Sequence, residues 1–93
     1  MVKIKKNNQH ICKIDEYGNK WWLFNSQLHR EDGPAIEYTD GTKYWYLHGQ
    51  QHRIDGPAYE DVNGTKFWWY YGEEIRCSSQ EEFNRLLKLK ALW

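Results

Sequence analysis

The fold of this chain is decided by residues 41–58, which read GTKYWYLHGQQHRIDGPA. Three residue types of this stretch recur on both sides at a spacing of 23 residues, and the recurring positions are Gly18, Gly41 and Gly64, Lys20, Lys43 and Lys66, and Trp22, Trp45 and Trp68. The segment HRxDGPA occurs twice at the same spacing, at residues 29–35 and 52–58. A period of this length is typical of repeat proteins, in which each unit packs against its neighbours. We therefore expect residues 18–76 to form an array of similar units.

Each unit carries two strand signals and two turn signals. In the middle unit, residues 43–48 are rich in aromatic residues that favour strands, and residues 58–61 form a second, shorter candidate strand. Asp40-Gly41 and Asn63-Gly64 supply the positive φ that tight hairpin turns need. We therefore expect each unit to be one β-hairpin. About three such hairpins give an antiparallel meander of roughly six strands.

The two ends of the chain differ from the repeats. Residues 1–17 match only the last part of a unit, so we expect a partial N-terminal unit there. Residues 79–93 change to a helical period, with Ser79 and Glu82 in the pattern of a capping box and Phe83 opening an apolar stripe. This amphipathic helix is predicted to pack on one face of the sheet and to cap the array. The whole chain is then a single, mainly β domain.

Strand alternation divides the aromatic residues between two faces of the predicted sheet. Trp22, Trp45 and Trp68 recur in every unit, so we assign them to a core beneath the helix. The other face varies between units and keeps Tyr hydroxyl groups, as a surface that contacts a partner would. Half-exposed aromatic pairs also stabilise a sheet by about 0.2–1 kcal/mol each, which is a purely structural alternative. The partner-binding residues predicted on this face and at its rim are Tyr44, Tyr46, Trp69, Tyr71, Lys43 and His48.

The repeated His-Arg-x-Asp segments suggest a general base or a metal ligand at first sight. We interpret them instead as a structural latch that recurs in successive units, because Arg and Asp can pair within one tight connection. The carboxylate can also accept amides of the Gly-Pro turn, and the imidazole can pack against a Trp. Ile75 takes the histidine position of the third unit, so we expect no metal. The predicted latch residues are His29, Arg30, Asp32, His52, Arg53 and Asp55.

Composition and motifs argue against several classes of protein. The 93 residues carry 13 basic and 13 acidic side chains, so no net charge attracts nucleic acid or an anionic membrane. The chain contains no glycine-rich phosphate loop, no GxSxG and no HExxH, so we expect neither an enzyme nor a cofactor. Cys12 and Cys77 lack a metal-binding spacing, and no segment is typical of a membrane span or a signal peptide. We expect a cytoplasmic protein with two reduced thiols.

Residues 40–52, DGTKYWYLHGQQH, resemble the MORN repeat in their period and in their Asp-Gly and Tyr positions. The units are also similar to the MORN-variant repeats of bacterial antitoxins, and HRxDGPA is similar to tandem repeats of phage and large-virus proteins. The resemblance covers about residues 11–76. The usual His-Gly-x-Gly of MORN units is replaced by HRxDGP, which argues against the lipid binding sometimes proposed for MORN arrays. The resemblance implies a β-hairpin array that serves as a non-catalytic scaffold for protein interactions.

These observations predict a small protein-interaction module that binds and blocks a partner protein through its aromatic face. The resemblance suggests a phage- or mobile-element-encoded inhibitor of host defence, or an antitoxin-like protein, acting in the cytoplasm of the host cell. The alternative is a binder of single-stranded nucleic acid or nucleotides, whose aromatic rings stack on bases while Lys20, Lys43 and Lys66 contact phosphates. Glu37 and Glu60 lie near these lysines and oppose such a phosphate track. A homodimer formed through the aromatic face is a further alternative.

Overall fold

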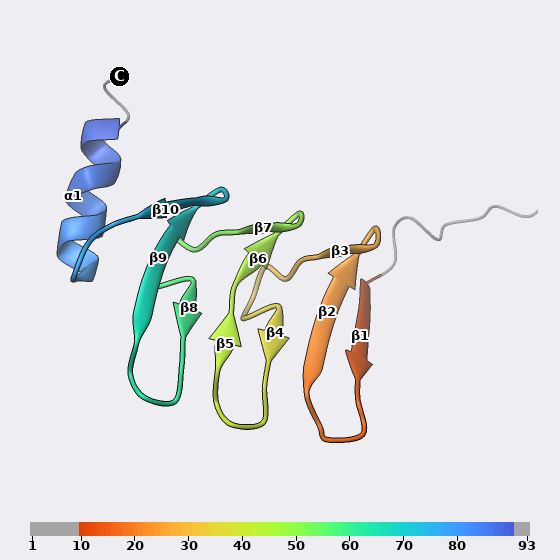
Figure 1. The fold of residues 1–93 in the computed structure, drawn as a ribbon. Helices are drawn as coiled ribbons and strands as arrows, with labels where there is room; N and C mark the ends of the chain where they lie inside the picture. The colour runs from red at the N-terminus through yellow and green to blue at the C-terminus, as the bar shows by residue number, and fades with distance from the viewer. Residues whose placement is uncertain (1–9, 91–93) are drawn as a thin grey trace, which may run out of the picture.

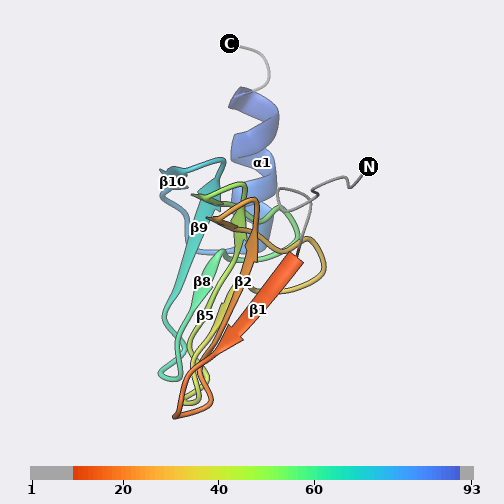
Figure 2. The same ribbon diagram turned by 90° about the vertical axis from the view of Figure 1, so that its right-hand side faces the viewer.

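The computed structural model describes residues 10–90 as an open β array that ends in one helix (Figure 1). Successive units lie side by side, and Figure 2 looks along the array, where their strands overlie one another. The array measures 51 × 34 × 16 Å, so it is long and thin. Residues 1–9 and 91–93, which belong to the predicted N-terminal unit and helix, lie outside the described residues.

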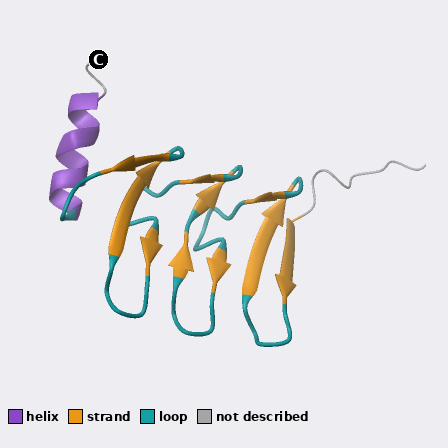
Figure 3. Cartoon of the chain, viewed as in Figure 1, coloured by secondary structure: helices purple, strands orange, loops and turns teal. Residues whose placement is uncertain are grey.

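The described residues form ten strands and one helix, distributed along the chain as hairpins (Figure 3). In chain order they are β1 (His10–Ile14), β2 (Lys20–Phe24), β3 (Gln27–Leu28), β4 (Ile36–Glu37), β5 (Lys43–Tyr44), β6 (Tyr46–Leu47), β7 (Gln50–Gln51), β8 (Tyr59–Glu60), β9 (Lys66–Tyr70), β10 (Glu73–Ile75) and α1 (Gln80–Lys90). The main sheet has the order β1-β2-β4-β5-β8-β9-β10, all antiparallel, with β3 beside β2 and with β6 and β7 as a separate hairpin. The predicted antiparallel meander with a C-terminal helix is confirmed.

The strands are more numerous than predicted because each long strand is followed by a second tight turn. These turns contain backbone of positive φ at Asn25 and Ser26, at His48 and Gly49, and at Tyr71 and Gly72. Each turn opens a short extra strand, namely β3, β7 or β10. In addition, the long strand of the middle unit is divided into β5 and β6 at Trp45. His48-Gly49 is a weaker turn signal than Asp-Gly or Asn-Gly, which is why the sequence did not indicate these strands.

A row of alternating large and small side chains forms the core of the array. The strand register places Trp22, Ala35, Trp45, Ala58 and Trp68 side by side across it. The amides of Trp22 and Trp45 donate to the carbonyls of Ala35 and Ala58, each at 2.8 Å. Both alanines are fully buried, because an indole on either side covers the small methyl group. The array thus gains close packing from a single layer.

The three tryptophans of this row are covered in two different ways. The guanidinium carbons of Arg30 and Arg53 lie 3.9 Å above the ring centroids of Trp22 and Trp45. Trp68, which is 6% exposed, instead donates its indole N–H to Oε1 of Gln80 at 2.7 Å. The prediction that the helix covers the whole tryptophan row was therefore wrong for two of its three members. An 11-residue helix is only about 16 Å long and stands at the end of the array (Figure 1).

The helix begins where the sequence predicts. Ser79 Oγ accepts the amide of Glu82 at 3.1 Å, and Glu82 Oε1 accepts the amide of Ser78 at 2.9 Å. This is a capping box whose return bond reaches one residue further back than expected. Phe83 is fully buried, and Lys90 at the other end pairs with Glu73 of β10 at 3.0 Å. The helix is thus attached to the last unit at both of its ends.

We expect Trp68→Ala to lower the free energy of unfolding by about 3–5 kcal/mol, because it empties a buried aromatic site beneath the helix. Trp22→Ala is the matched control, since that ring lies near the open end of the array and is only half-buried. Urea denaturation of both variants measures the difference. Equal losses would show that the helix adds nothing to the burial of Trp68.

Candidate functional site

The two faces of the sheet present different chemistry. We call the side that carries Trp22, Trp45 and Trp68 the tryptophan face; α1 packs on this side, where Gln80 reaches Trp68. We call the opposite side the aromatic face. Its central row consists of residues paired across neighbouring strands, and these are Trp21, Ile36, Tyr44, Tyr59 and Phe67.

Rings on the aromatic face contact one another along the array. Tyr44 meets Tyr59 with ring centroids 5.0 Å apart, and Tyr59 meets Phe67 at 5.4 Å. Tyr38 packs edge-on against Trp21 at 6.1 Å and against Tyr44 at 6.0 Å. Most of these rings are half-buried by their neighbours, whereas Phe67 is 43% exposed. Contacts of this kind hold the rings in fixed positions.

Only part of the predicted partner-binding set shares this face. Tyr44 and Tyr46 lie on it, with ring centroids 6.5 Å apart, and burial raises the pKa of Tyr46, so its hydroxyl remains a donor. Trp69 follows Trp68 along β9 and therefore points to the aromatic face as well, where it is half-buried. Lys43 lies two residues before Trp45 and belongs to the tryptophan face.

Tyr71 was predicted on the wrong face, and His48, predicted at the rim, lies on that same face. Both have positive φ, of 46° and 49°, because they sit in the second turn of their units, and strand alternation fails there. The ring of Tyr71 stacks on His52 with centroids 3.8 Å apart, and His48 lies 4.3 Å from His29. The turn thus carries both side chains to the tryptophan face.

The lysine column is interleaved with acidic residues on neighbouring strands. The cross-strand order is Lys20, Glu37, Lys43, Glu60 and Lys66. Unlike charges face each other at every step of this ladder. A phosphate chain laid along it would meet a carboxylate after every ammonium group, which weakens the case for a nucleic-acid track.

The two His-Arg-x-Asp connections have the same geometry in both copies. Arg30 donates from Nε to Asp32 at 3.0 Å and from Nη1 to the Pro34 carbonyl at 3.1 Å and to Glu37 at 3.2 Å. Arg53 repeats these bonds 23 residues later. The Arg–Asp pair agrees with the sequence prediction. The indole is covered by the guanidinium and not, as had been predicted, by the imidazole. The guanidinium is also the donor to Asp32, where the prediction had the amides of the turn.

Gly56 and its equivalent Gly33 make room for this arrangement. A Cβ at Gly56 would lie 2.5 Å from the guanidinium carbon of Arg53, and one at Gly33 would lie 2.9 Å from that of Arg30. Any side chain at these positions would push the arginine away from its indole. The motif therefore requires glycine because the guanidinium lies so close to its Cα, and not because the backbone has an unusual conformation.

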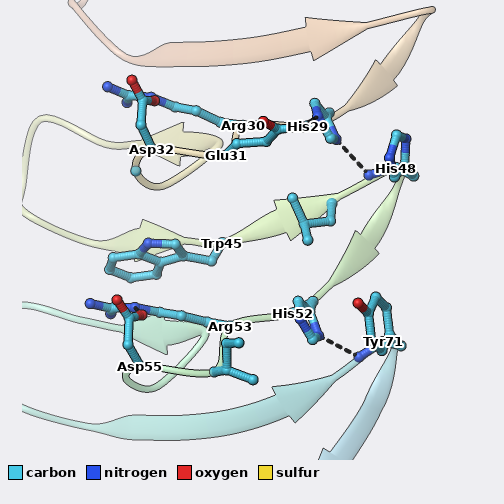
Figure 4. Close-up of a pocket in the computed structure, with 13 residues that line it drawn as sticks. His29, Arg30, Glu31, Asp32, Trp45, His48, His52, Arg53, Asp55 and Tyr71 are labelled. Carbon is cyan, nitrogen blue, oxygen red and sulfur yellow. Dashed lines mark hydrogen bonds and ion pairs between the residues drawn. The ribbon is translucent and has the colours of Figure 1, made fainter.

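The histidines connect each unit to the next. His29 Nδ1 accepts the amide of His48, and His52 Nδ1 accepts the amide of Tyr71, both at 2.9 Å (Figure 4). An acceptor at Nδ1 fixes the neutral tautomer with its proton on Nε2. His29 and His52 are 2% and 6% exposed, and burial lowers the pKa of His52. Each imidazole therefore holds the second turn of the following unit.

A cleft of about 680 Å³ opens on the tryptophan face between the two connections (Figure 4). Its lining consists of His29, Arg30, Glu31, Asp32, Gly33, Trp45, Leu47, His48, His52, Arg53, Ile54, Asp55 and Tyr71. No pattern in the sequence was interpreted as this cleft, although the signal for it was present. Two copies of a bulky connection, separated by one strand pair, leave a gap between them.

Other candidate chemistry is limited within residues 10–90. No group of three His, Cys, Asp or Glu side chains is placed there to hold a metal ion. Cys12 is exposed and Cys77 half-buried, neither is in a disulfide, and burial raises the pKa of Cys77. The helix found in this part of the chain is neither long nor apolar enough to cross a membrane.

Comparisons with models of known protein families, with curated proteins and with solved structures gave no match to this chain. The likeness to MORN units therefore remains a resemblance of sequence.

The lowered pKa of His52 gives a pH-dependent stability. The folded protein binds fewer protons at this site than the unfolded chain, whose histidine has a pKa of about 6.5. We expect the free energy of unfolding to be highest above about pH 6.5, to fall as the pH drops towards the lowered folded pKa, and to level off below it. Urea denaturation between pH 8 and pH 5 measures the profile, with both limits being about 1.5 units from the unfolded pKa.

His52→Asn provides the matched control. The amide oxygen of Asn can take the place of Nδ1 and accept the Tyr71 amide, but Asn does not titrate. The variant should therefore lose less of its pH 8 stability than His52→Leu, and its profile should be flatter than that of the wild type. An unchanged slope would assign the pH dependence to another group.

Proposed function

We propose that this chain is a non-catalytic protein-interaction module that binds a partner protein through its aromatic face. The observation that carries the proposal is that this face lies open along the array. Within residues 10–90, the helix packs beside Trp68 on the opposite side, and the Arg30 and Arg53 connections also cover the tryptophan face. A row of aromatic side chains is thus left without a covering layer.

The chemistry of the face favours protein as the partner. Tyr and Trp dominate the binding energy of many protein interfaces, because they combine a large contact area with few rotatable bonds and a polar group. Here Tyr44 and Tyr46 carry hydroxyl groups on rings that are already held by neighbours. The partner should offer a flat apolar patch with hydrogen-bond acceptors at its edge.

The resemblance to MORN-variant antitoxins and phage proteins supports the biological setting. A small, rigid array without an enzymatic motif is suited to blocking a surface of its partner. We therefore propose an antitoxin-like protein or a phage- or mobile-element-encoded inhibitor of host defence, acting in the cytoplasm. The nucleic-acid alternative has less support, since Glu37 and Glu60 alternate with the lysines of the ladder.

Photo-crosslinking tests which face the partner occupies. A benzophenone amino acid in place of Tyr46 should form a covalent adduct with one partner protein in lysate of the host. The same amino acid in place of Ile14 is the control, because Ile14 is 61% exposed and, like Cys12, lies on the tryptophan face of β1. An adduct from Ile14 but not from Tyr46 would move the interface to the other face.

We expect Tyr46→Ala to weaken binding of the captured partner by about 2 kcal/mol or more, roughly a thirtyfold increase in Kd. Its effect on stability should be nearer to about 1 kcal/mol, since the ring contributes half-exposed pair contacts. Calorimetric titration and urea denaturation measure the two quantities. Loss of binding that merely follows loss of folding would contradict the proposed interface, and a concentration-dependent doubling of mass in light scattering would identify the partner as a second copy of the chain.

A further inference from the structure

The cleft on the tryptophan face has features of a binding site that is separate from the proposed interface. Its volume of about 680 Å³ lies in the range of small-ligand sites. Trp45 and Leu47 supply apolar surface, and two successive connections form its walls (Figure 4). The aromatic face lies on the other side of the sheet, so a ligand here and a partner there do not compete for the same residues.

The charge at the mouth of the cleft is negative. Glu31, Asp32 and Asp55 line it with side chains that are 79%, 87% and 87% exposed. The two arginines do not neutralise this charge, because each is already paired with two carboxylates. Arg30 binds Asp32 and Glu37, and Arg53 binds Asp55 and Glu60. The carboxylate of Glu31 lies outside these pairs, and Nε2 of the neutral His29 is 3.4 Å from it.

A buried hydrogen-bond donor faces the same space. His52 is 6% exposed, and its Nδ1 accepts the amide of Tyr71, so Nε2 carries the proton. Within residues 10–90, Nε2 of His52 has no hydrogen-bond partner. Every fully enclosed side-chain nitrogen or oxygen atom of this region does have a partner. The Nε2–H group is therefore not fully enclosed, and His52 lines the cleft. At the equivalent place in the preceding connection, Nε2 of His29 lies 3.4 Å from a carboxylate oxygen of Glu31.

The wall of the cleft also contains an indole. Figure 4 shows Arg53 directly beneath the ring of Trp45, with Asp32 and Arg30 further away on its other side. The guanidinium carbon of Arg53 lies 3.9 Å from the ring centroid. The protein therefore already shows how a guanidinium is held here, between an indole ring and two carboxylates.

We propose that this cleft binds the side chain of an arginine residue presented by a peptide segment of another protein. The guanidinium of the ligand pairs with the carboxylates of Glu31 and Asp32 and packs beside Trp45. The main-chain carbonyl of the same arginine accepts the Nε2–H of His52. Arginine suits the site better than lysine, because a planar guanidinium both stacks on an indole and donates in parallel to carboxylates.

The ligand chemistry is tested with N-acetyl-arginine methylamide as the probe. Titration into the labelled protein should give saturable NMR shifts for the Trp45 indole and the His52 ring, with little change at Tyr44 and Tyr59. The citrulline analogue has the same shape without the charge and should bind at least about tenfold more weakly. Methylguanidinium alone should bind more weakly as well, since it lacks the carbonyl for His52. Equal binding of the citrulline analogue, or no saturable shift up to about 10 mM probe, overturns the proposal.

Variants locate the contacts. Glu31→Gln should weaken binding of the probe about two- to fivefold, as expected for an exposed charge pair, whereas Glu16→Gln at a distant turn should have no effect. His52→Asn keeps the bond to Tyr71 but removes the donor at the position of Nε2, because the amide nitrogen of Asn lies closer to the main chain. The variant should therefore reduce the advantage of the probe over methylguanidinium. Ile54 is the counterpart of Glu31 in the next connection and lines the cleft, so Ile54→Glu should tighten binding. No change with any of these variants places the arginine elsewhere.

Tyr46→Ala separates this proposal from the interface proposed above. That variant should bind the arginine probe as the wild type does, even if it loses its partner protein. A loss of probe binding in Tyr46→Ala, with folding intact, would show that the two sites are one.

Discussion

The stacking of an arginine on a tryptophan holds this thin protein together. A single-layer sheet has no second layer to bury its rings, and only the last indole of the row reaches the helix. Arg30 and Arg53 supply the missing cover, with their charge neutralised by carboxylates on both sides. Gly33 and Gly56 leave room for the two guanidinium groups, because a Cβ at either position would lie 2.9 Å or less from a guanidinium carbon. The same two arginines line the cleft between the connections.

The sequence predicted the structure best where a residue type has one structural role, such as a turn glycine or a helix cap. The 23-residue spacing predicted the meander, and Asp-Gly and Asn-Gly predicted the turns after β4 and β8. The helix start at Ser79 followed from its capping pattern. These features are local, so short-range propensity and hydrogen bonding decide them.

Long-range features were harder to predict. His48 and Tyr71 continue an apparent strand pattern, yet a positive φ turns both to the other face. The sequence also gives no sign that Arg30, rather than His29, covers the indole, because both are close enough in the chain to reach it. The cleft was missed for a similar reason: it is formed by two connections 23 residues apart, and neither forms a hollow alone. Of the candidate site, Tyr44, Tyr46 and Trp69 could be placed from alternation.

The bonds from His29 and His52 to the following turn have a direction, and that direction has a geometric consequence. Each unit donates its turn amide to the histidine of the unit before it, so the contact joins unlike surfaces and never closes on itself. Such an array can grow by whole units without any change to those present. A chain lengthened by one more 23-residue copy in its middle would gain one further tryptophan, one further guanidinium cover and one further hollow. The number of such clefts therefore follows the number of repeated units that the gene encodes. Adding or removing a unit would change how many side chains one molecule can hold at once.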